Sequence, residues 1–246
     1  MKTIAAISDI HGNILALEAV VRDISKRQVD GIVNLGDHLS GPLWPKETIK
    51  FLMQQHWIQI SGNHDRQLST QDPRTHGLSD GYAFAVLNDV EKEWLRQLPT
   101  NVQMDENTLL FHGTPSSDTE YFLETIEHGR ARLASRSEIK KKLGNTRSPL
   151  MVCGHTHIQR IVDIDDNTII VNPGSVGLPA YKDDLPEPHV IESGSPHARY
   201  AILLYDDTWT VELISVMYDF QEAADRARKN NRPDWAIALQ TGCMTQ

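Results

Sequence analysis

The sequence predicts a mixed α/β protein built from two packed mixed sheets with helices on their outer faces. Short apolar runs in the first half alternate with amphipathic helical segments, which is the pattern of βαβ units. The second half contains pairs of apolar runs joined by short turns rich in Asp and Asn, which predict hairpins. Such a mixture favours stacked layers of sheet and helix. A chain of 246 residues can bury a large core, so we expect a single domain over residues 1–246.

The first half is expected to alternate strands with helices. Runs rich in Ile, Val and Leu predict strands over residues 3–7, 31–35 and 57–60. Helices are expected over about residues 13–27, 45–55 and 82–98. Asn13 is the expected N-cap of the first helix, Pro45 opens the second, and the third is expected to break near Asn88. The polar, turn-rich residues 67–79 predict a loop.

The second half is expected to contain three hairpins. Their strands, with one further strand over 150–153, are predicted over residues 101–104, 108–111, 159–164, 168–171, 198–205 and 208–216. Residues 119–143, 220–230 and 234–240 are expected to be largely helical. Residues 177–196 hold four prolines and several acidic residues, which predicts a long surface loop. Such a loop either serves a function or is a mobile connection, and the sequence favours neither.

Five short polar clusters each follow a strand-like run. They lie at residues 8–13, 36–38, 62–65, 111–113 and 154–157. Open α/β sheets bind ligands at the carboxyl ends of their strands, so we expect these clusters to meet at one edge. Together they offer two Asp, one Asn and several His, a ligand set that suits two ions of the Mn, Fe, Co, Ni or Zn type. One such cluster would be weak evidence, but five in order predict a metal site.

The spacing within two clusters suggests how one ion is held. Asp9 and His11 flank Ile10, and His155 and His157 flank Thr156. In an extended chain, alternate side chains leave on the same side. We therefore expect two same-side pairs that face each other and chelate one ion.

These clusters, in this order from residue 9 to residue 157, resemble the signature of the calcineurin-like metallophosphoesterase superfamily, the metallo-dependent phosphatases. The short chain and its opening cluster resemble the small bacterial and archaeal phosphodiesterase-like branch. The resemblance implies a four-layer α-β-β-α sandwich with two metals at one edge. It also implies a role for each matching residue. Asp9, His11 and His157 match ligands of the first metal, Asn63, His112 and His155 match ligands of the second, and Asp37 matches the bridging carboxylate. His64 matches the histidine beside the substrate, and Asp65 its orienting partner.

The resemblance implies a metal-dependent phosphoric ester hydrolase in which a metal-bridging hydroxide attacks the phosphorus. Its cofactors would be two divalent transition-metal ions, with Mn²⁺ favoured over Fe, Ni²⁺, Co²⁺ or Zn²⁺. The substrate could be a phosphodiester, a phosphomonoester or a nucleotide-type pyrophosphate, and no substrate-binding residue is assigned. The alternative is a non-catalytic interaction scaffold on the same fold. Because such members lack the counterpart of His64, its presence here favours the enzyme.

The remaining histidines are expected to stay outside the chemistry. His38 departs from the superfamily pattern and is expected to be a partly exposed loop histidine, although a substrate contact stays open. Surface or loop positions are expected for His56, His76, His128, His189 and His197. The role of residues 172–177, which resemble a family feature near the site, does not follow from their spacing.

Composition bears on partners and location. The net charge of −9 argues against a nucleic-acid partner and leaves a small phosphorylated substrate as the expected one. No segment is long and apolar enough to span a membrane. A cleaved signal at the N-terminus would remove the strand before Asp9, so we expect a cytoplasmic protein. The sequence does not specify an oligomeric state.

Overall fold

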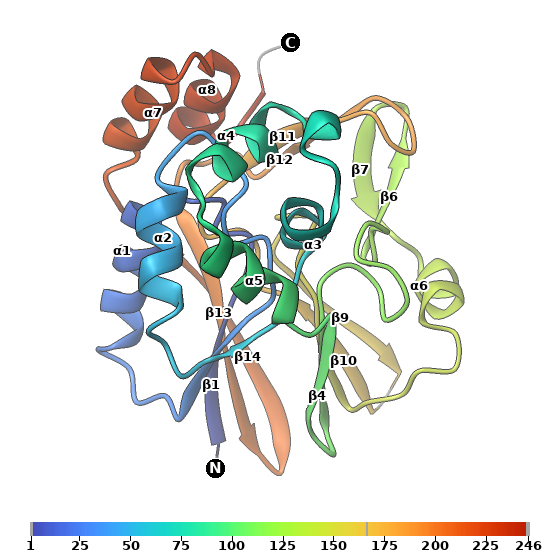
Figure 1. The fold of residues 1–246 in the computed structure, drawn as a ribbon. Helices are drawn as coiled ribbons and strands as arrows, with labels where there is room; N and C mark the ends of the chain where they lie inside the picture. Colours follow the sequence, from blue (N-terminus) through green and yellow to red (C-terminus); the bar gives the residue numbers. More distant parts are fainter. Residues whose placement is uncertain (1, 166, 245–246) are drawn as a thin grey trace.

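The computed structural model describes residues 2–165 and 167–244, and in these residues it contains three mixed sheets and eight α-helices (Figure 1). The first sheet has the strand order β14-β13-β1-β2-β3 and the second the order β4-β5-β8-β10-β9. Both combine parallel and antiparallel neighbours. The predicted α/β class with two packed mixed sheets is confirmed. Position 166 of one expected hairpin turn lies outside the described residues.

The first sheet supplies three of the five polar clusters. Its strands are β1 (Lys2–Ile7), β2 (Gly31–Asn34), β3 (Ile58–Gln59), β13 (Ala198–Asp206) and β14 (Thr208–Val216). Its outer face packs against α1 (Ile14–Ile24), where Leu17 and Val20 are fully buried. Asn13 caps this helix as predicted, because its side-chain oxygen accepts from the Ala16 N–H at 3.2 Å. The helix α2 (Pro45–Leu52) opens on the predicted proline.

The second sheet supplies the other two clusters. Its strands are β4 (Asn101–Asp105), β5 (Thr108–Phe111), β8 (Leu150–Val152), β9 (Arg160–Asp165) and β10 (Thr168–Asn172). The helix α6 (Arg136–Leu143) covers its outer face through Ile139 and Leu143. Between the two sheets lies a core that includes Ile4 and Val33 from one side and Leu110 and Val152 from the other. Each such buried side chain contributes roughly 1.5–3 kcal/mol, so this core fixes the two sheets against each other.

The third sheet corrects two of the expectations. It joins β6 (Glu124–Glu127) and β7 (Arg130–Leu133) to β11 (Ala180–Asp183) and β12 (His189–Glu192). The expectation of helix over 119–143 is therefore wrong except for α6. The turn between β6 and β7 consists of His128 and Gly129, both with positive φ, and this suits a two-residue hairpin turn. The expectation of a loop over 177–196 is also wrong, because this segment forms the strands β11 and β12. Two of its four prolines fall in the turn between these strands.

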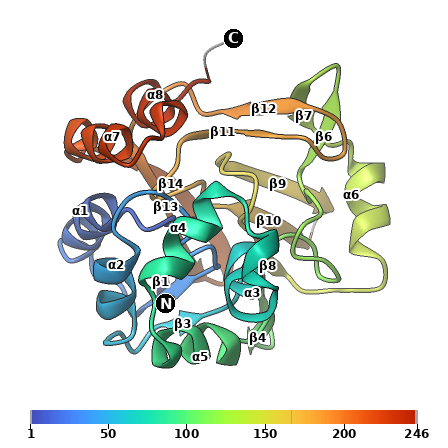
Figure 2. The same cartoon turned by 45° about the horizontal axis from the view of Figure 1, so that its top comes forward.

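Helices complete the edge above the sheets. The expected loop over 67–79 is largely helical: α3 (Asn63–Thr70) runs into it, a short 3-10 turn (Pro73–Thr75) follows, and α4 (Leu78–Val86) begins within it. The predicted break near Asn88 is confirmed, since Asn88 caps α5 (Asp89–Gln97). At the C-terminal end, α7 (Phe220–Lys229) packs on α8 (Pro233–Thr241). Figure 2 shows β11 and β12 running from α8 across to β6 and β7. Across the described ranges, no helix has the length and apolar character that crossing a bilayer requires.

Candidate metal centre

The five polar clusters meet where β1, β2, β3, β5 and β8 end, as their positions after strands predict. Two groups of potential ligands form there. One atom from each of Asp9, His11 and His157 lies within 4.8 Å of the others, and the same holds for Asp37, His112 and His155. The structure thus brings together the histidine and aspartate sets that the family resemblance implies. We call them the Asp9 triad and the Asp37 triad. The expectation that His155 and His157 chelate one ion together with Asp9 and His11 is wrong, because His155 groups with Asp37 and His112.

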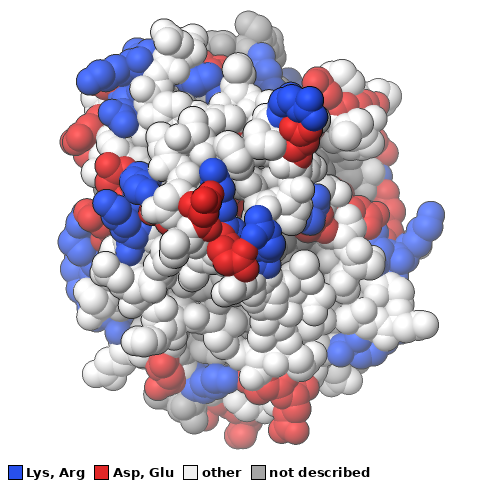
Figure 3. Space-filling view, in the orientation of Figure 1, with Lys and Arg blue, Asp and Glu red and all other residues white. Residues whose placement is uncertain are grey.

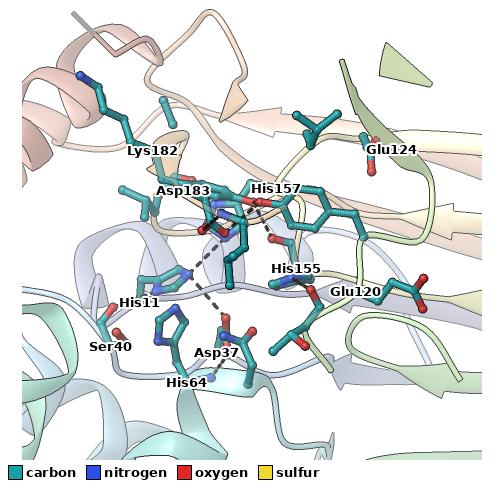
Figure 4. Close-up of a pocket in the computed structure, with 18 of the residues that line it drawn as sticks. His11, Asp37, Ser40, His64, Glu120, Glu124, His155, His157, Lys182 and Asp183 are labelled. Carbon is teal, nitrogen blue, oxygen red and sulfur yellow. Dashed lines mark hydrogen bonds and ion pairs between the residues drawn. The ribbon is translucent and has the colours of Figure 1, made fainter. Parts of the chain in front are cut away.

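Asp37 contacts its own triad and also faces the Asp9 triad. Its Oδ2 is 3.3 Å from His112 Nε2 and 4.0 Å from His11 Nε2, so it faces both groups. Figure 4 shows its contact with His11. Within the Asp9 triad, the aspartate Oδ1 is 3.3 Å from His157 Nε2, which is 3.2 Å from His11 Nε2. The Asn63 side-chain oxygen is 3.2 Å from His112 Nε2 and so joins the Asp37 triad.

Backbone carbonyls orient the four histidine rings. The Nδ1 atoms of three rings lie 2.7 Å from carbonyl oxygens: His11 from Ser40, His112 from Leu35 and His157 from Leu178. His155 is turned the other way, with Nε2 3.0 Å from the Thr119 carbonyl. When these nitrogens donate, the second nitrogen of each ring is directed into the centre. This is how metal-binding histidines are commonly held.

The backbone reaches this geometry through left-handed turns rather than extended chain. The φ angles are positive at Asp9, His11, Asp37, His155 and His157. The expectation that alternation in an extended strand pairs these side chains is therefore wrong, since β1 ends at Ile7. Left-handed backbone is uncommon outside glycine and is retained where the surroundings enforce it, often at functional sites. Here the Asp9 and His11 N–H groups donate to the Gly36 and Asp37 carbonyls at 3.0 Å.

The charges of the centre favour a cation. Burial opposes protonation of His112, yet the carboxylates of Asp37 and Asp9 raise its pKa to about 10. Burial would raise the pKa of Asp9, but His157 and His112 hold it at about 2. Burial lowers the pKa of both His11 and His155 to about 4, so these rings are neutral at pH 7. Asp9 Oδ1 is buried without a hydrogen-bond partner, which a bound cation would supply. The two triads are consistent with a dinuclear metal site.

His64 stands beside the triads and faces the adjoining cavity. Its side chain is 32% exposed, whereas those of His11, His112 and His157 are at most 4% exposed. Its backbone N–H donates to Asp37 Oδ1 at 2.9 Å, and its Nδ1 lies 2.9 Å from Asp80 Oδ1. Burial opposes its charge, but Asp37 and the hydrogen bond to Asp80 raise the pKa of His64 to about 9. The ring is thus placed to carry a proton into the cavity.

Comparison with known proteins decides the family. The calcineurin-like phosphoesterase superfamily domain matches residues 1–191 of this chain. The chain belongs to the calcineurin-like phosphoesterase superfamily. It is similar over its whole length to small archaeal and bacterial members of this fold, as the sequence resemblance predicts.

Three similar proteins cover nearly the whole of this phosphoesterase-superfamily chain. A metallophosphoesterase crystal structure from Sphaerobacter thermophilus has a TM-score of 0.75 at 24% identity, covering 98% of this chain and 99% of that one. A hypothetical protein from Pyrococcus horikoshii has a TM-score of 0.72 at 19% identity and full coverage of both. An uncharacterized protein of Methanocaldococcus jannaschii is 24% identical over 94% of each chain. The two structures share the fold of this superfamily member.

Asp65 does not orient His64 in this superfamily member, which corrects the sequence expectation. Instead its carboxylate is fully buried and accepts from three backbone N–H groups, those of Asp37 at 2.8 Å, His38 at 3.0 Å and Gly62 at 2.9 Å. It also lies 2.7 Å from His38 Nδ1. Asp65 therefore ties the loop after β2 to the start of α3. His38 is fully buried rather than partly exposed, and its contact is structural, as the favoured interpretation has it.

Replacing Asp65 should destabilise the fold. In Asp65→Ala, the N–H groups of Asp37, His38 and Gly62 lose their acceptor in a buried place, and each unsatisfied donor costs about 1–3 kcal/mol. We expect the free energy of unfolding, measured by urea denaturation of the metal-free protein, to fall by roughly 3 kcal/mol or more. The exposed Asp206 at the end of β13 offers a control, since Asp206→Ala should change the free energy of unfolding by less than about 0.5 kcal/mol. Equal stability of the two variants would contradict this role.

Residues 172–177 support the loops of the centre, a role that the sequence did not reveal. The Asn172 side-chain amide donates to the Gly154 carbonyl at 2.8 Å, and Ser175 Oγ donates to the Asp9 carbonyl at 2.8 Å. A Cβ at Gly177 would lie 1.7 Å from the Ile10 carbonyl oxygen, so only glycine allows this approach.

A further contact corrects the expectation for His189, which is buried rather than exposed. Its Nε2 lies 3.0 Å from the Tyr121 hydroxyl, whose ring packs against that of His155 at 5.0 Å between centroids. The third sheet is thereby joined to the loop that carries His155 and His157.

Proposed function

We propose that the chain is a phosphoesterase that hydrolyses a small phosphate ester with two divalent transition-metal ions, Mn²⁺ being favoured. The first ion would be held by Asp9, His11 and His157 and the second by Asn63, His112 and His155, with Asp37 shared. The observation that supports this proposal is that the two triads meet at Asp37. Every histidine ring of the triads is held by a backbone carbonyl. The mixed set of imidazole, carboxylate and amide ligands suits Mn²⁺, Fe, Co²⁺, Ni²⁺ or Zn²⁺ and disfavours Ca²⁺.

Bound in these triads, the two cations would supply Lewis acidity at the phosphate and lower the pKa of the attacking water. Side chains of the protein would supply the uncharged ligand and the proton for the leaving group. Asn63 adds a ligand without charge, which leaves the centre more favourable to an anionic ester. His64, held by Asp80, is placed to give a proton to the leaving oxygen. Its exposed edge faces a cavity of about 1150 Å³ that also borders Asp37, His155 and His157, so an ester can reach both the triads and the proton donor.

The surface supports a small substrate rather than a nucleic acid. On the face drawn in Figure 3, basic and acidic side chains are interspersed, and the net charge of the chain is −9. A long polyanion gains affinity from a continuous basic stripe, whereas a single phosphate is neutralised locally by metal ions.

A substrate panel tests the proposal. The purified protein is loaded in turn with Mn²⁺, Ni²⁺ or Zn²⁺ and its metal content is determined. It is then assayed on a bis-aryl phosphate, an aryl monophosphate, a cyclic nucleotide and a dinucleoside tetraphosphate. We expect turnover of at least one ester that is abolished by chelation and restored by the metal. If protein with two metals bound hydrolyses none of them, the proposal fails and the non-catalytic scaffold is supported.

Metal binding should strengthen as the pH rises. His112, whose pKa of about 10 keeps it protonated in the metal-free protein, must lose that proton before its Nε2 can bind a cation. Raising the pH removes the competing proton, so affinity should increase from about pH 6 to pH 9, with about one proton released per chain at neutral pH. Isothermal titration with Mn²⁺ in buffers of different ionisation enthalpy measures the release. An affinity that does not change over this range would contradict the assignment of His112.

A further inference from the structure

The third sheet and the segment that leads into it supply no ligand to either triad, yet each places a tyrosine ring against a ligand histidine. Tyr181 of β11 packs on His157 with 4.7 Å between ring centroids, and Tyr121, shortly before β6, packs on His155 with 5.0 Å. Both pairs are edge-to-face, with 62° between the ring planes, which is a favoured arrangement of aromatic rings. One histidine of each triad is therefore in contact with a tyrosine.

The two tyrosines are also joined to each other and to the backbone of the loop at residues 154–157. The Tyr181 hydroxyl lies 2.9 Å from the Tyr121 hydroxyl oxygen and 3.2 Å from the His155 carbonyl oxygen, so two acceptors share its proton. The Tyr121 hydroxyl in turn lies 3.0 Å from His189 Nε2 and 3.3 Å from Asp183 Oδ2. The pair thus links the 154–157 loop to both β11 and β12.

The far end of this hydrogen-bonded chain is fixed as well. His189 is 5% exposed, and its Nδ1 lies 2.6 Å from the Glu187 carbonyl oxygen. Because Nδ1 of the neutral ring donates there, Nε2 accepts from the Tyr121 hydroxyl, whose oxygen then accepts from Tyr181. The hydrogen bonds therefore run in one direction, from Tyr181 through Tyr121 to His189. A polar network whose members are all satisfied holds its side chains in one arrangement.

His155 depends on this support more than the other ligand histidines do. Of the four, it is the one that is partly exposed, and the other three are buried. Its Nε2 lies 3.0 Å from the carbonyl oxygen of Thr119, two residues before Tyr121. The same short segment thus supplies both the hydrogen-bond partner and the packing partner of this ring. Since such outer partners set the orientation of a ligand ring, this segment decides where His155 Nδ1 points.

We infer that Tyr121 and Tyr181 are positioning residues of the metal centre, and that their hydrogen-bonded pair holds His155 and His157 at the separation at which each triad binds an ion. The inference rests on the proposed function, which places an ion in each triad. It goes further by giving the third sheet a role, since the sheet acts on both triads through this pair without supplying a ligand.

Mn²⁺ binding to hydroxyl-deleted variants tests the inference. Tyr181→Phe keeps the ring on His157 but removes the hydroxyl that reaches Tyr121 and the His155 carbonyl. Isothermal titration of the metal-free protein should show two bound ions, one of which Tyr181→Phe binds about tenfold or more weakly. Tyr121→Phe should show the same loss, because it breaks the link to His189. Tyr205→Phe is the matched control and should bind both ions normally, since Tyr205 pairs with Lys2 at the end of β1 remote from Asp9.

The double variant tests whether the two hydroxyls act as a pair. Because each acts through the other, Tyr121→Phe combined with Tyr181→Phe should bind the affected ion at most about threefold more weakly than the weaker single variant. If the two losses multiplied in full, the tyrosines would act independently and the paired role would be wrong.

Thermal unfolding of the metal-free variants separates positioning from general stability. Each phenylalanine variant loses one hydroxyl and should lower Tm by no more than about 6 °C, so that folded proteins are compared. If both single variants bound two ions as tightly as the unmodified protein, whatever their Tm, the tyrosines would be merely structural and the inference wrong, while the proposed function would stand. If the unmodified protein bound fewer than two ions, the proposed function would fail and the inference with it.

Discussion

Asp37→Asn is expected to remove at least one of the two metal ions and to reduce phosphoesterase activity by about 10³-fold or more. The carboxylate contacts its own triad and also faces the Asp9 triad, 3.3 Å from His112 Nε2 and 4.0 Å from His11 Nε2, so its loss weakens both groups at once. The substituted amide can still accept the His64 N–H that now reaches Asp37 Oδ1, which limits damage to the fold. Elemental analysis of the purified variant measures the bound metal directly.

Two further substitutions test whether the metal loss is specific to Asp37. Asn63→Ala removes an uncharged group whose side-chain oxygen lies 3.2 Å from His112 of the Asp37 triad, so it should cost less metal than Asp37→Asn. Asp206→Asn changes the same residue type at an exposed position and should keep both ions and full activity. Two retained metals per chain in Asp37→Asn would overturn the shared role of this carboxylate.

The residues of the candidate centre could be predicted because their positions depend on local pattern. An apolar run followed by a polar cluster marks the end of a strand, and strand ends of packed sheets lie at a common edge. Asp9, Asp37 and His112 therefore met as expected. The reason given for the pairing of Asp9 with His11 was nevertheless wrong, because the backbone turns left-handed there. Periodicity alone does not report such turns at residues other than glycine.

Other features depend on contacts between distant segments. Asp80 lies 16 residues beyond His64, just past the stretch 67–79 that is expected to be a loop, and the packing of α4 on α3 brings the two side chains together. Asp65 follows His64 directly, but the first turn of α3 directs its carboxylate back to the backbone of the β2 loop. The carbonyls that hold the histidine rings cannot be predicted from the sequence either, because every residue has a carbonyl group. The third sheet does not follow from the sequence because each of its strands has only four residues, and the prolines in the turn between β11 and β12 favour a long loop over two short strands.

His64→Ala is expected to keep both metals while slowing turnover by roughly 10²–10⁴-fold, the usual contribution of a positioned general acid. The ring is not part of either triad, and its side chain is 32% exposed to the cavity, so its removal should leave the fold intact. Because the proposed role is proton donation to the leaving oxygen, the loss should be larger for alkyl esters than for a nitrophenyl ester, whose leaving group departs without a proton. Rates on such a pair of esters, with metal content measured in parallel, test this directly.

Asp80→Asn extends the test to the partner that the structure identifies. Asp80 is 7% exposed and holds His64 Nδ1 at 2.9 Å, and its negative charge helps to keep the ring protonated. Since the proposed proton donation needs a protonated His64, activity on alkyl esters should fall as the pH rises through its pKa, and Asp80→Asn should move that fall to lower pH. The substitution should also cost about 10–100-fold in rate, less than the loss of the ring itself.

His56→Ala, at an exposed histidine, is the matched control and should keep the rate of the unmodified protein. If His64→Ala and Asp80→Asn both retained full activity on alkyl esters, the proton would reach the leaving oxygen from another source.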